Sequence, residues 1–160
     1  MPARTKVMIV DDHPLIRHGL ADLLSHEHDL EVCATVADVS SAWDSLTEHE
    51  PSLVIVDLAL KGGDGLELIK NLHAARPGVR ILALSMHDEK LYAERALSAG
   101  AAGYLEKQAP PETILKALRD VMAGRVYLSP AMSERFLHQM VRRTAVTSRT
   151  PLETLGLALP

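Results

Sequence analysis

The sequence predicts an α/β protein with a doubly wound, five-stranded parallel sheet and helices on both faces. Short apolar runs alternate with longer segments of helical period along the first 124 residues. The run Leu53–Val56 is continuously apolar, which is typical of a parallel strand that is buried on both sides. Five strand-then-helix units therefore indicate one sheet, with each strand joined to the next by a crossover helix.

The individual elements follow from the same periodicity. Pro14 suits the first position of a helix, because its missing N–H would have no partner there. Asp38 is a candidate N-cap, and Gly100 and Gly124 stand where a left-handed C-cap is favoured. We expect strands near residues 6–10, 31–36, 53–57, 80–85 and 102–105, and helices near 14–26, 38–48, 64–75, 88–98 and 111–123.

A sixth helix is expected from about residue 130 to 143, with Phe136, Leu137 and Met140 on one side. This side could be a dimerisation surface or could pack on its own domain. The polar residues 144–150 are interpreted as a linker. The prediction is one domain over residues 1–124, followed by a linker helix and truncated tail over 125–160 with no complete DNA-binding domain.

The composition fits an ordinary globular protein, with 47% hydrophobic and 24% charged residues among 160. Aromatic residues make up 3%, so the core must be aliphatic. Cys33 is the single cysteine, which excludes an internal disulfide. No run approaches the roughly 20 apolar residues of a membrane span, and no signal peptide is recognisable, so we expect a cytoplasmic protein without membrane contact.

The net charge of −4 is unevenly distributed. Residues 1–123 carry 12 Lys and Arg against 19 Asp and Glu, whereas residues 124–160 carry 5 against 2. An acidic body is unfavourable for direct binding of nucleic acid. A solvated linker explains the small basic excess near the C-terminus at least as well as a phosphate-binding patch does.

Polar residues follow four of the predicted strands directly. Asp11 and Asp12 follow the first strand, Asp57 ends the third, Ser85 ends the fourth, and Lys107 comes after the fifth. Because the carboxyl ends of parallel strands meet at one rim of a sheet, we expect these side chains in one crevice. Clustered carboxylates repel each other and favour a hard cation such as Mg²⁺.

This set of side chains suits phosphoryl transfer to a carboxylate. Asp57 is the candidate nucleophile and would form an acyl phosphate. Mg²⁺ held by Asp12 and Asp57, with Asp11 contributing through water, would offset the repulsion between two anions. Lys107 supplies a second positive charge, and the Ser85 hydroxyl can donate to a phosphoryl oxygen.

The ordered set resembles the receiver domain of two-component response regulators over about residues 5–124. Tyr104 matches the aromatic switch residue of that family. The resemblance is closest to the NarL/FixJ subfamily, in the stretches VDDHPLIR at 10–17, LSMH at 84–87, AGAAGYL at 99–105 and GRVYLSP at 124–130.

The resemblance implies strand order 2-1-3-4-5, a phosphohistidine donor on a sensor histidine kinase, and a transcriptional output. It implies that Asp57 is the phosphoacceptor, that Ser85 and Tyr104 form the switch, and that the chain is a signalling domain rather than an enzyme. A homodimer is possible. DNA binding is expected only of a longer form with a helix-turn-helix domain, because none is recognisable here.

The family pattern also implies roles for three further positions near the crevice. The backbone carbonyl of Ala59 is a candidate Mg²⁺ ligand. Lys61 stands where many receivers have proline and adds a charge near the crevice. Ala59 and His87 occupy positions that tune the lifetime of the acyl phosphate in the family. Lys61, through its charge, and His87, through its position, are therefore candidate modulators.

Other functions remain open at this point. An aspartyl phosphatase would have the motif Asp-x-Asp after the first strand, whereas Asp11 and Asp12 of this chain are adjacent. A flavodoxin-like cofactor protein would need a hydroxyl-rich phosphate loop after that strand, which is absent. An adaptor that kept the fold and lost the switch is compatible with the sequence. The scattered histidines lack the paired spacing of a zinc site.

Overall fold

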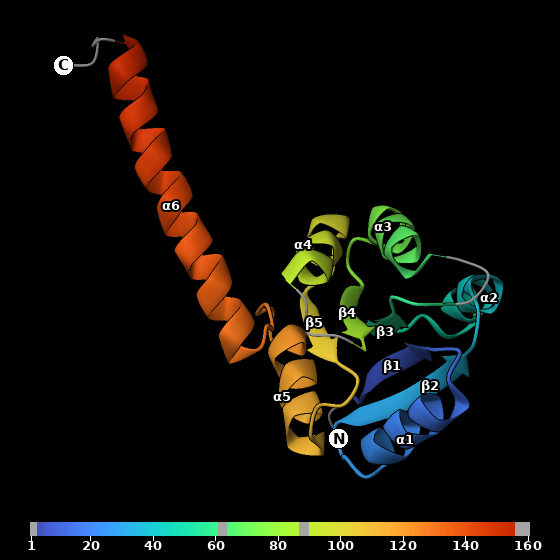
Figure 1. Cartoon of the computed structure of the whole chain (residues 1–160). Helices are drawn as coiled ribbons and strands as arrows, with labels where there is room; N and C mark the ends of the chain where they lie inside the picture. The colour runs from blue at the N-terminus through green and yellow to red at the C-terminus, as the bar shows by residue number, and fades with distance from the viewer. Residues whose placement is uncertain (1–2, 61–63, 87–89, 156–160) are drawn as a thin grey trace. The chain divides into compact units, whose positions relative to one another are not determined.

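The computed structural model describes residues 3–60, 64–86 and 90–155, and the side chains up to residue 144 except that of Lys90. The chain forms two compact units, Met1–Leu128 and Ser129–Pro160. The first unit contains the sheet and five helices, and the second contains one long helix (Figure 1).

The first unit is a five-stranded parallel sheet in the order β2-β1-β3-β4-β5, as the resemblance implied. The strands are β1 (Thr5–Val10), β2 (Leu30–Val36), β3 (Leu53–Asp57), β4 (Arg80–Ser85) and β5 (Gly103–Glu106). The helices are α1 (Pro14–Ser25), α2 (Val39–His49), α3 (Gly65–Ala75), α4 (Lys90–Ala99) and α5 (Pro111–Met122). The predicted elements are confirmed, with ends that shift by one or two residues.

Alternate residues of the central strands fill two separate cores. Figure 1 shows α1 and α5 on one side of the sheet and α2, α3 and α4 on the other. Ile9 and Ile55 belong to the core on the α1 and α5 side, together with Leu24 and Leu118. Because both faces are covered, all five residues of β3 are buried, which explains its uninterrupted apolar sequence.

The predicted helix signals are confirmed. Pro14 is the first residue of α1, and the Asp38 side chain accepts a hydrogen bond of 2.8 Å from the Ser41 N–H at the start of α2. Gly100 and Gly124 have positive φ angles of 121° and 87°. These residues fix the helix ends, and Pro14 also fixes the end of the loop after β1 that carries Asp11 and Asp12.

The chain after α5 returns to the free edge of β5. The Tyr104 N–H donates to the Tyr127 carbonyl and the Tyr127 N–H donates to the Ala102 carbonyl, both at 3.0 Å. Gly103 permits this approach, since a Cβ atom there would lie 3.1 Å from the Tyr127 Cβ. The segment therefore covers the edge next to the predicted switch residue.

The second unit corrects one expectation. Its helix α6 runs over Pro130–Leu155, so the interpretation of residues 144–150 as a linker was wrong. That stretch contains no glycine or proline to end a helix, and polarity alone does not. The helix starts with Ser129, whose hydroxyl accepts a hydrogen bond of 3.2 Å from the Met132 N–H.

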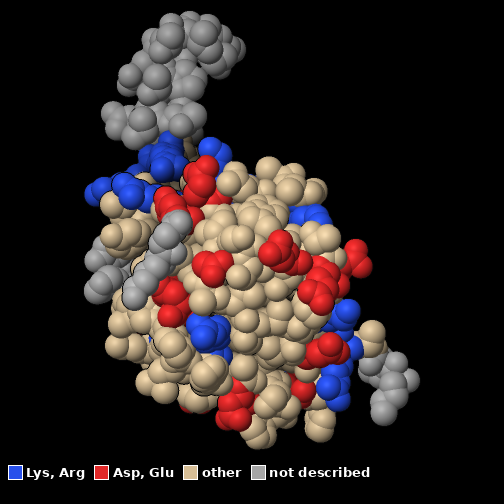
Figure 2. Space-filling model, turned by 90° about the vertical axis from the view of Figure 1, so that its right-hand side faces the viewer, with Lys and Arg blue, Asp and Glu red and all other residues tan. Residues whose placement is uncertain are grey.

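The acidic character of the first unit is visible on its surface. On the face in Figure 2, Asp and Glu side chains are scattered over the body with Lys and Arg between them. This pattern agrees with the excess of acidic residues in the first 123 positions. Among the helices that the structure describes, we find none with the length and apolar character that crossing a bilayer requires.

Gly65 allows α3 to begin directly behind the end of β3. A Cβ atom at Gly65 would lie 2.7 Å from the Leu58 Cα and would also collide with the Asp57 carbonyl oxygen. We predict that Gly65→Ala lowers the free energy of unfolding by about 1–3 kcal/mol, since backbone must move to admit the methyl group. Urea unfolding measures this change.

Gly78→Ala is the matched control, because nothing lies within 4 Å of a Cβ atom at that position. Its stability should equal that of the wild type or exceed it slightly, through reduced freedom of the unfolded chain. Equal stability of the two alanine variants would contradict the close approach of α3 to β3.

Candidate functional site

The carboxyl ends of the strands bring the predicted residues together. Asp11 follows β1, Asp57 ends β3, Ser85 ends β4 and Lys107 follows β5. The side chains of Asp11, Asp57 and Lys107 have no exposed area, and Ser85 is 7% exposed. Two buried carboxylates next to each other are costly unless positive charge compensates them.

Lys107 provides this positive charge. Its Nζ lies 3.0 Å from Asp57 Oδ2 and 3.2 Å from Asp11 Oδ2. Its backbone N–H donates a hydrogen bond of 2.7 Å to the Ser85 carbonyl, which fixes the loop after β5 against the end of β4. The ammonium is thus held between the two carboxylates rather than solvated.

The Asp57 carboxyl has a raised pKa. Burial is the main cause, and the nearby Asp11 adds to it, whereas the Ala59 N–H and Lys107 act in the opposite direction. The Ala59 N–H donates to Asp57 Oδ1 at 3.0 Å. One Asp57 oxygen is therefore held by backbone and the other faces the ammonium.

The loop after β1 is fixed around Asp11. The Arg17 guanidinium donates to the Asp11 carbonyl at 2.7 Å, and the His13 N–H donates to Asp11 Oδ1 at 2.8 Å. Both contacts are made by residues at the start of α1 or just before it. The helix therefore orients the carboxylate that lies deepest at the end of β1.

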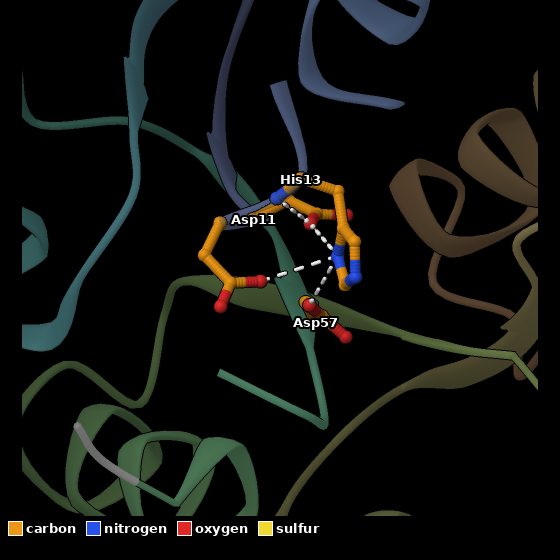
Figure 3. A group of neighbouring side chains, drawn as sticks. Asp11, His13 and Asp57 are labelled. Atoms are coloured by element: carbon orange, nitrogen blue, oxygen red, sulfur yellow. Dashed lines mark hydrogen bonds and ion pairs between the residues drawn. The ribbon is translucent and has the colours of Figure 1, made fainter. Parts of the chain in front are cut away.

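His13 is a member of the site that sequence reasoning missed. Its Nδ1 lies 2.9 Å from Asp11 Oδ1, 3.2 Å from Asp12 Oδ1 and 3.5 Å from Asp57 Oδ2. Figure 3 shows the imidazole directed at the carboxylates. Its place directly after the aspartate pair was a signal, although it does not fit the paired histidine spacing of a zinc site.

The residues present fit a divalent cation. Asp11, Asp12, His13 and Asp57 each offer one ligand atom, and these atoms lie within 4.8 Å of one another. The Oδ2 atoms of Asp11 and Asp57 are buried, and the positive charge beside both of them is the Lys107 ammonium. Even with Lys107 alongside, this acidic pocket carries excess negative charge that a cation would offset.

The structure describes two of the four remaining predicted site residues, Tyr104 and Ala59. Tyr104 lies on β5 and is 2% exposed, so its ring is directed inward. Ala59 contributes its N–H to Asp57, and the role of its carbonyl stays a prediction. Lys61 and His87, the candidate modulators, lie outside the described residues.

Comparison with known proteins identifies the class of this chain. Residues 7–119 match the response regulator receiver domain, and the chain belongs to that family. A solved two-component response regulator of the LuxR family from Aurantimonas sp. SI85-9A1 aligns with a TM-score of 0.80 and 32% identity, over 87% of this chain and 99% of that one.

Within the family, the chain is a receiver of the NarL/LuxR type. It is 34% identical over 140 residues to the oxygen regulatory protein NreC of Staphylococcus carnosus. The receiver domain of the putative response regulator NarL from Mycobacterium tuberculosis aligns with a TM-score of 0.73 and 32% identity, over 78% of this chain and all of that one. The match covers 87% of this chain and 64% of NreC.

The raised pKa of Asp57 predicts a specific pH dependence of stability. Folding raises this pKa above the unfolded value near 3.8, so the unfolded chain binds fewer protons between the two values and stability falls as pH rises through that window. With chelator present, Asp57→Asn should therefore be more stable than wild type at neutral pH. The difference should shrink as pH falls toward 3.8.

Urea unfolding over a pH series measures this difference. Asp44→Asn, at an exposed position on α2, is the control and should match the wild type at neutral pH. A lower stability of Asp57→Asn at neutral pH would show that the Lys107 ion pair outweighs the cost of burying the charge.

Proposed function

We propose that this chain is a phosphorylation-controlled switch in which Asp57 accepts a phosphoryl group from a phosphohistidine of a sensor kinase. The observation that carries the proposal is the buried Asp57 carboxylate, with Lys107 Nζ at 3.0 Å and two further carboxylates of the same pocket beside it. This arrangement combines a nucleophile with fixed positive charge and a cation site.

In the proposed reaction, an Asp57 oxygen attacks phosphorus, the bond from phosphorus to the histidine nitrogen breaks, and the released imidazole keeps that electron pair. Mg²⁺, when bound by Asp11, Asp12 and Asp57, supplies charge neutralisation for the phosphoryl oxygens. The Ala59 N–H orients the nucleophile at 3.0 Å. The Lys107 ammonium offsets the negative charge that gathers at Asp57.

We propose that Ser85 and Tyr104 change position when Asp57 is phosphorylated and so alter the conformation of the domain. Ser85 ends β4, and Asp57 pairs with Leu84, the residue directly before it. Its hydroxyl can donate to a phosphoryl oxygen. Tyr104 lies on β5, which pairs with β4. In this proposal, a movement at the end of β4 reaches Tyr104 and changes the surface formed by α4 and β5.

The domain catalyses only its own phosphorylation and dephosphorylation in this proposal, and is not an enzyme acting on a separate substrate. We propose a cytoplasmic protein that contacts a sensor histidine kinase and forms a homodimer. Solved structures of RcsB, 26% identical to this chain, include two dimers bound to DNA. The chain spans a little under two thirds of its NreC relatives, and we propose that residues 1–160 do not themselves bind specific DNA.

The kinase must cover the mouth of the pocket to deliver its phosphoryl group. Leu15 at the start of α1 is 84% exposed, two residues after His13. Leu15 lines a groove of about 490 Å³ together with Ile114 of α5 and Lys107. An exposed leucine beside such a groove suits an apolar helix of the donor.

Intact mass after incubation with acetyl phosphate and Mg²⁺ tests the proposal. We predict a gain of one phosphoryl group in the wild type and in the exposed-surface control Asp44→Asn, and none in Asp57→Asn. Acetyl phosphate replaces the kinase, so the result depends on this chain alone. Incorporation into Asp57→Asn would refute the assignment, and no incorporation into the wild type would favour an adaptor without a switch.

A further inference from the structure

His13 has a position in the acidic pocket that the proposed phosphorylation chemistry does not use. Its Nδ1 lies within 3.5 Å of one oxygen from each of the three carboxylates. The imidazole is about half exposed, whereas Asp11 and Asp57 have no exposed area. The ring therefore lies between the solvent and the buried carboxylate oxygens of the pocket, with Nδ1 directed at these oxygens (Figure 3).

Nδ1 is the ring nitrogen that faces the pocket. It lies 2.9 Å from Asp11 Oδ1, which only accepts hydrogen bonds, and 2.9 Å from Lys107 Nζ, which only donates them. Its contacts therefore fit either tautomer of the neutral ring. Together with one oxygen from each of Asp11, Asp12 and Asp57, it belongs to a set of ligand atoms that lie within 4.8 Å of one another, and a neutral imidazole binds a metal through the lone pair of such a nitrogen.

The backbone of His13 is fixed before any cation binds. His13 is the N-cap residue of α1, with φ −89° and ψ 107°. Pro14 restricts the preceding residue to this extended region, and the His13 N–H is tied to Asp11 Oδ1 at 2.8 Å. A ligand with a fixed backbone costs less ordering on binding than one on a mobile loop.

An imidazole ligand changes which cation a carboxylate pocket prefers. Mg²⁺ favours oxygen ligands and retains several waters. Imidazole nitrogen suits Fe, Ni, Cu and Zn. Mn²⁺ prefers oxygen ligands, but it accepts a nitrogen ligand more readily than Mg²⁺ does. The carboxylates supply the attraction for any divalent cation, so the nitrogen decides between cations rather than creating the site.

We propose that His13 Nδ1 is a direct ligand of the divalent cation in this pocket and raises its preference for Mn²⁺ over Mg²⁺. The inference rests on the proposed function for the presence of the cation, and it adds a specificity-determining residue to that site. A histidine that only hydrogen-bonds to the carboxylates would give no such preference.

Electron spin echo spectroscopy of the Mn²⁺ complex tests the ligand directly. In the wild-type chain, we expect ¹⁴N modulation from a coordinated imidazole, and replacement by the ¹⁵N pattern when histidine is labelled. His13→Ala should lose the modulation. His18→Ala, which removes an exposed histidine from the next turn of α1, should retain it. A wild-type Mn²⁺ complex without nitrogen modulation would overturn the proposal.

Calorimetric titration of the metal-free protein tests the preference. His13→Ala should weaken Mn²⁺ binding by about tenfold or more, the scale on which changes around a metal site lower affinity. Mg²⁺ binding should remain the same, since water replaces the nitrogen. Equal losses for the two metals would overturn the specificity, because they would indicate a purely structural role.

The two proposals fail in different ways. If wild type shows nitrogen modulation but gains no phosphoryl group from acetyl phosphate, His13 is a ligand and the phosphorylation proposal is wrong. If it is phosphorylated with Mg²⁺ but shows no modulation with Mn²⁺, the receiver chemistry stands and the His13 proposal is wrong. Binding of neither metal would contradict the cation site itself, and both proposals with it.

Discussion

Two buried carboxylates that repel each other, Asp11 and Asp57, and the Lys107 ammonium that lies between them are the interaction on which the rest of the site depends. Lys107 Nζ is within 3.2 Å of both, yet one positive charge does not balance the carboxylates of the pocket. Burial makes each uncompensated charge expensive. The raised pKa of Asp57 expresses this cost, and a cation bound in the pocket would offset the excess charge.

The fold creates this arrangement by its topology. The order β2-β1-β3-β4-β5 puts β3 at the centre, so Asp57 lies between the strand that delivers Asp11 and the strand that delivers Ser85. Lys107 then comes from beyond β4, and its backbone contact with Ser85 ties β5 to the pocket. The chain after α5 pairs with β5 through Tyr127, next to Tyr104. Both the pocket and the segment after α5 are therefore hydrogen-bonded to β5 or to the loop that follows it.

Most of the fold and the central site were predictable because each depends on local signals. Continuous apolar runs marked the strands, and Pro14, Asp38, Gly100 and Gly124 marked helix ends. Asp57 and Lys107 were predictable because parallel strands must end at one rim. His13 was missed although it directly follows the aspartate pair, because the direction of its ring depends on how the loop around Asp11 folds. The continuation of α6 past residue 143 was missed because polar residues were taken to end the helix.

The most direct test of this account is the effect of Mg²⁺ on stability. In urea unfolding at neutral pH, Mg²⁺ at ten times its dissociation constant should stabilise the wild type by about 1.4 kcal/mol, by mass action on the folded state. The double variant with Asp11→Asn and Asp57→Asn should gain much less, because the two buried charges are gone. An unchanged wild type, or an equal gain in the double variant, would contradict a cation site built on uncompensated buried charge.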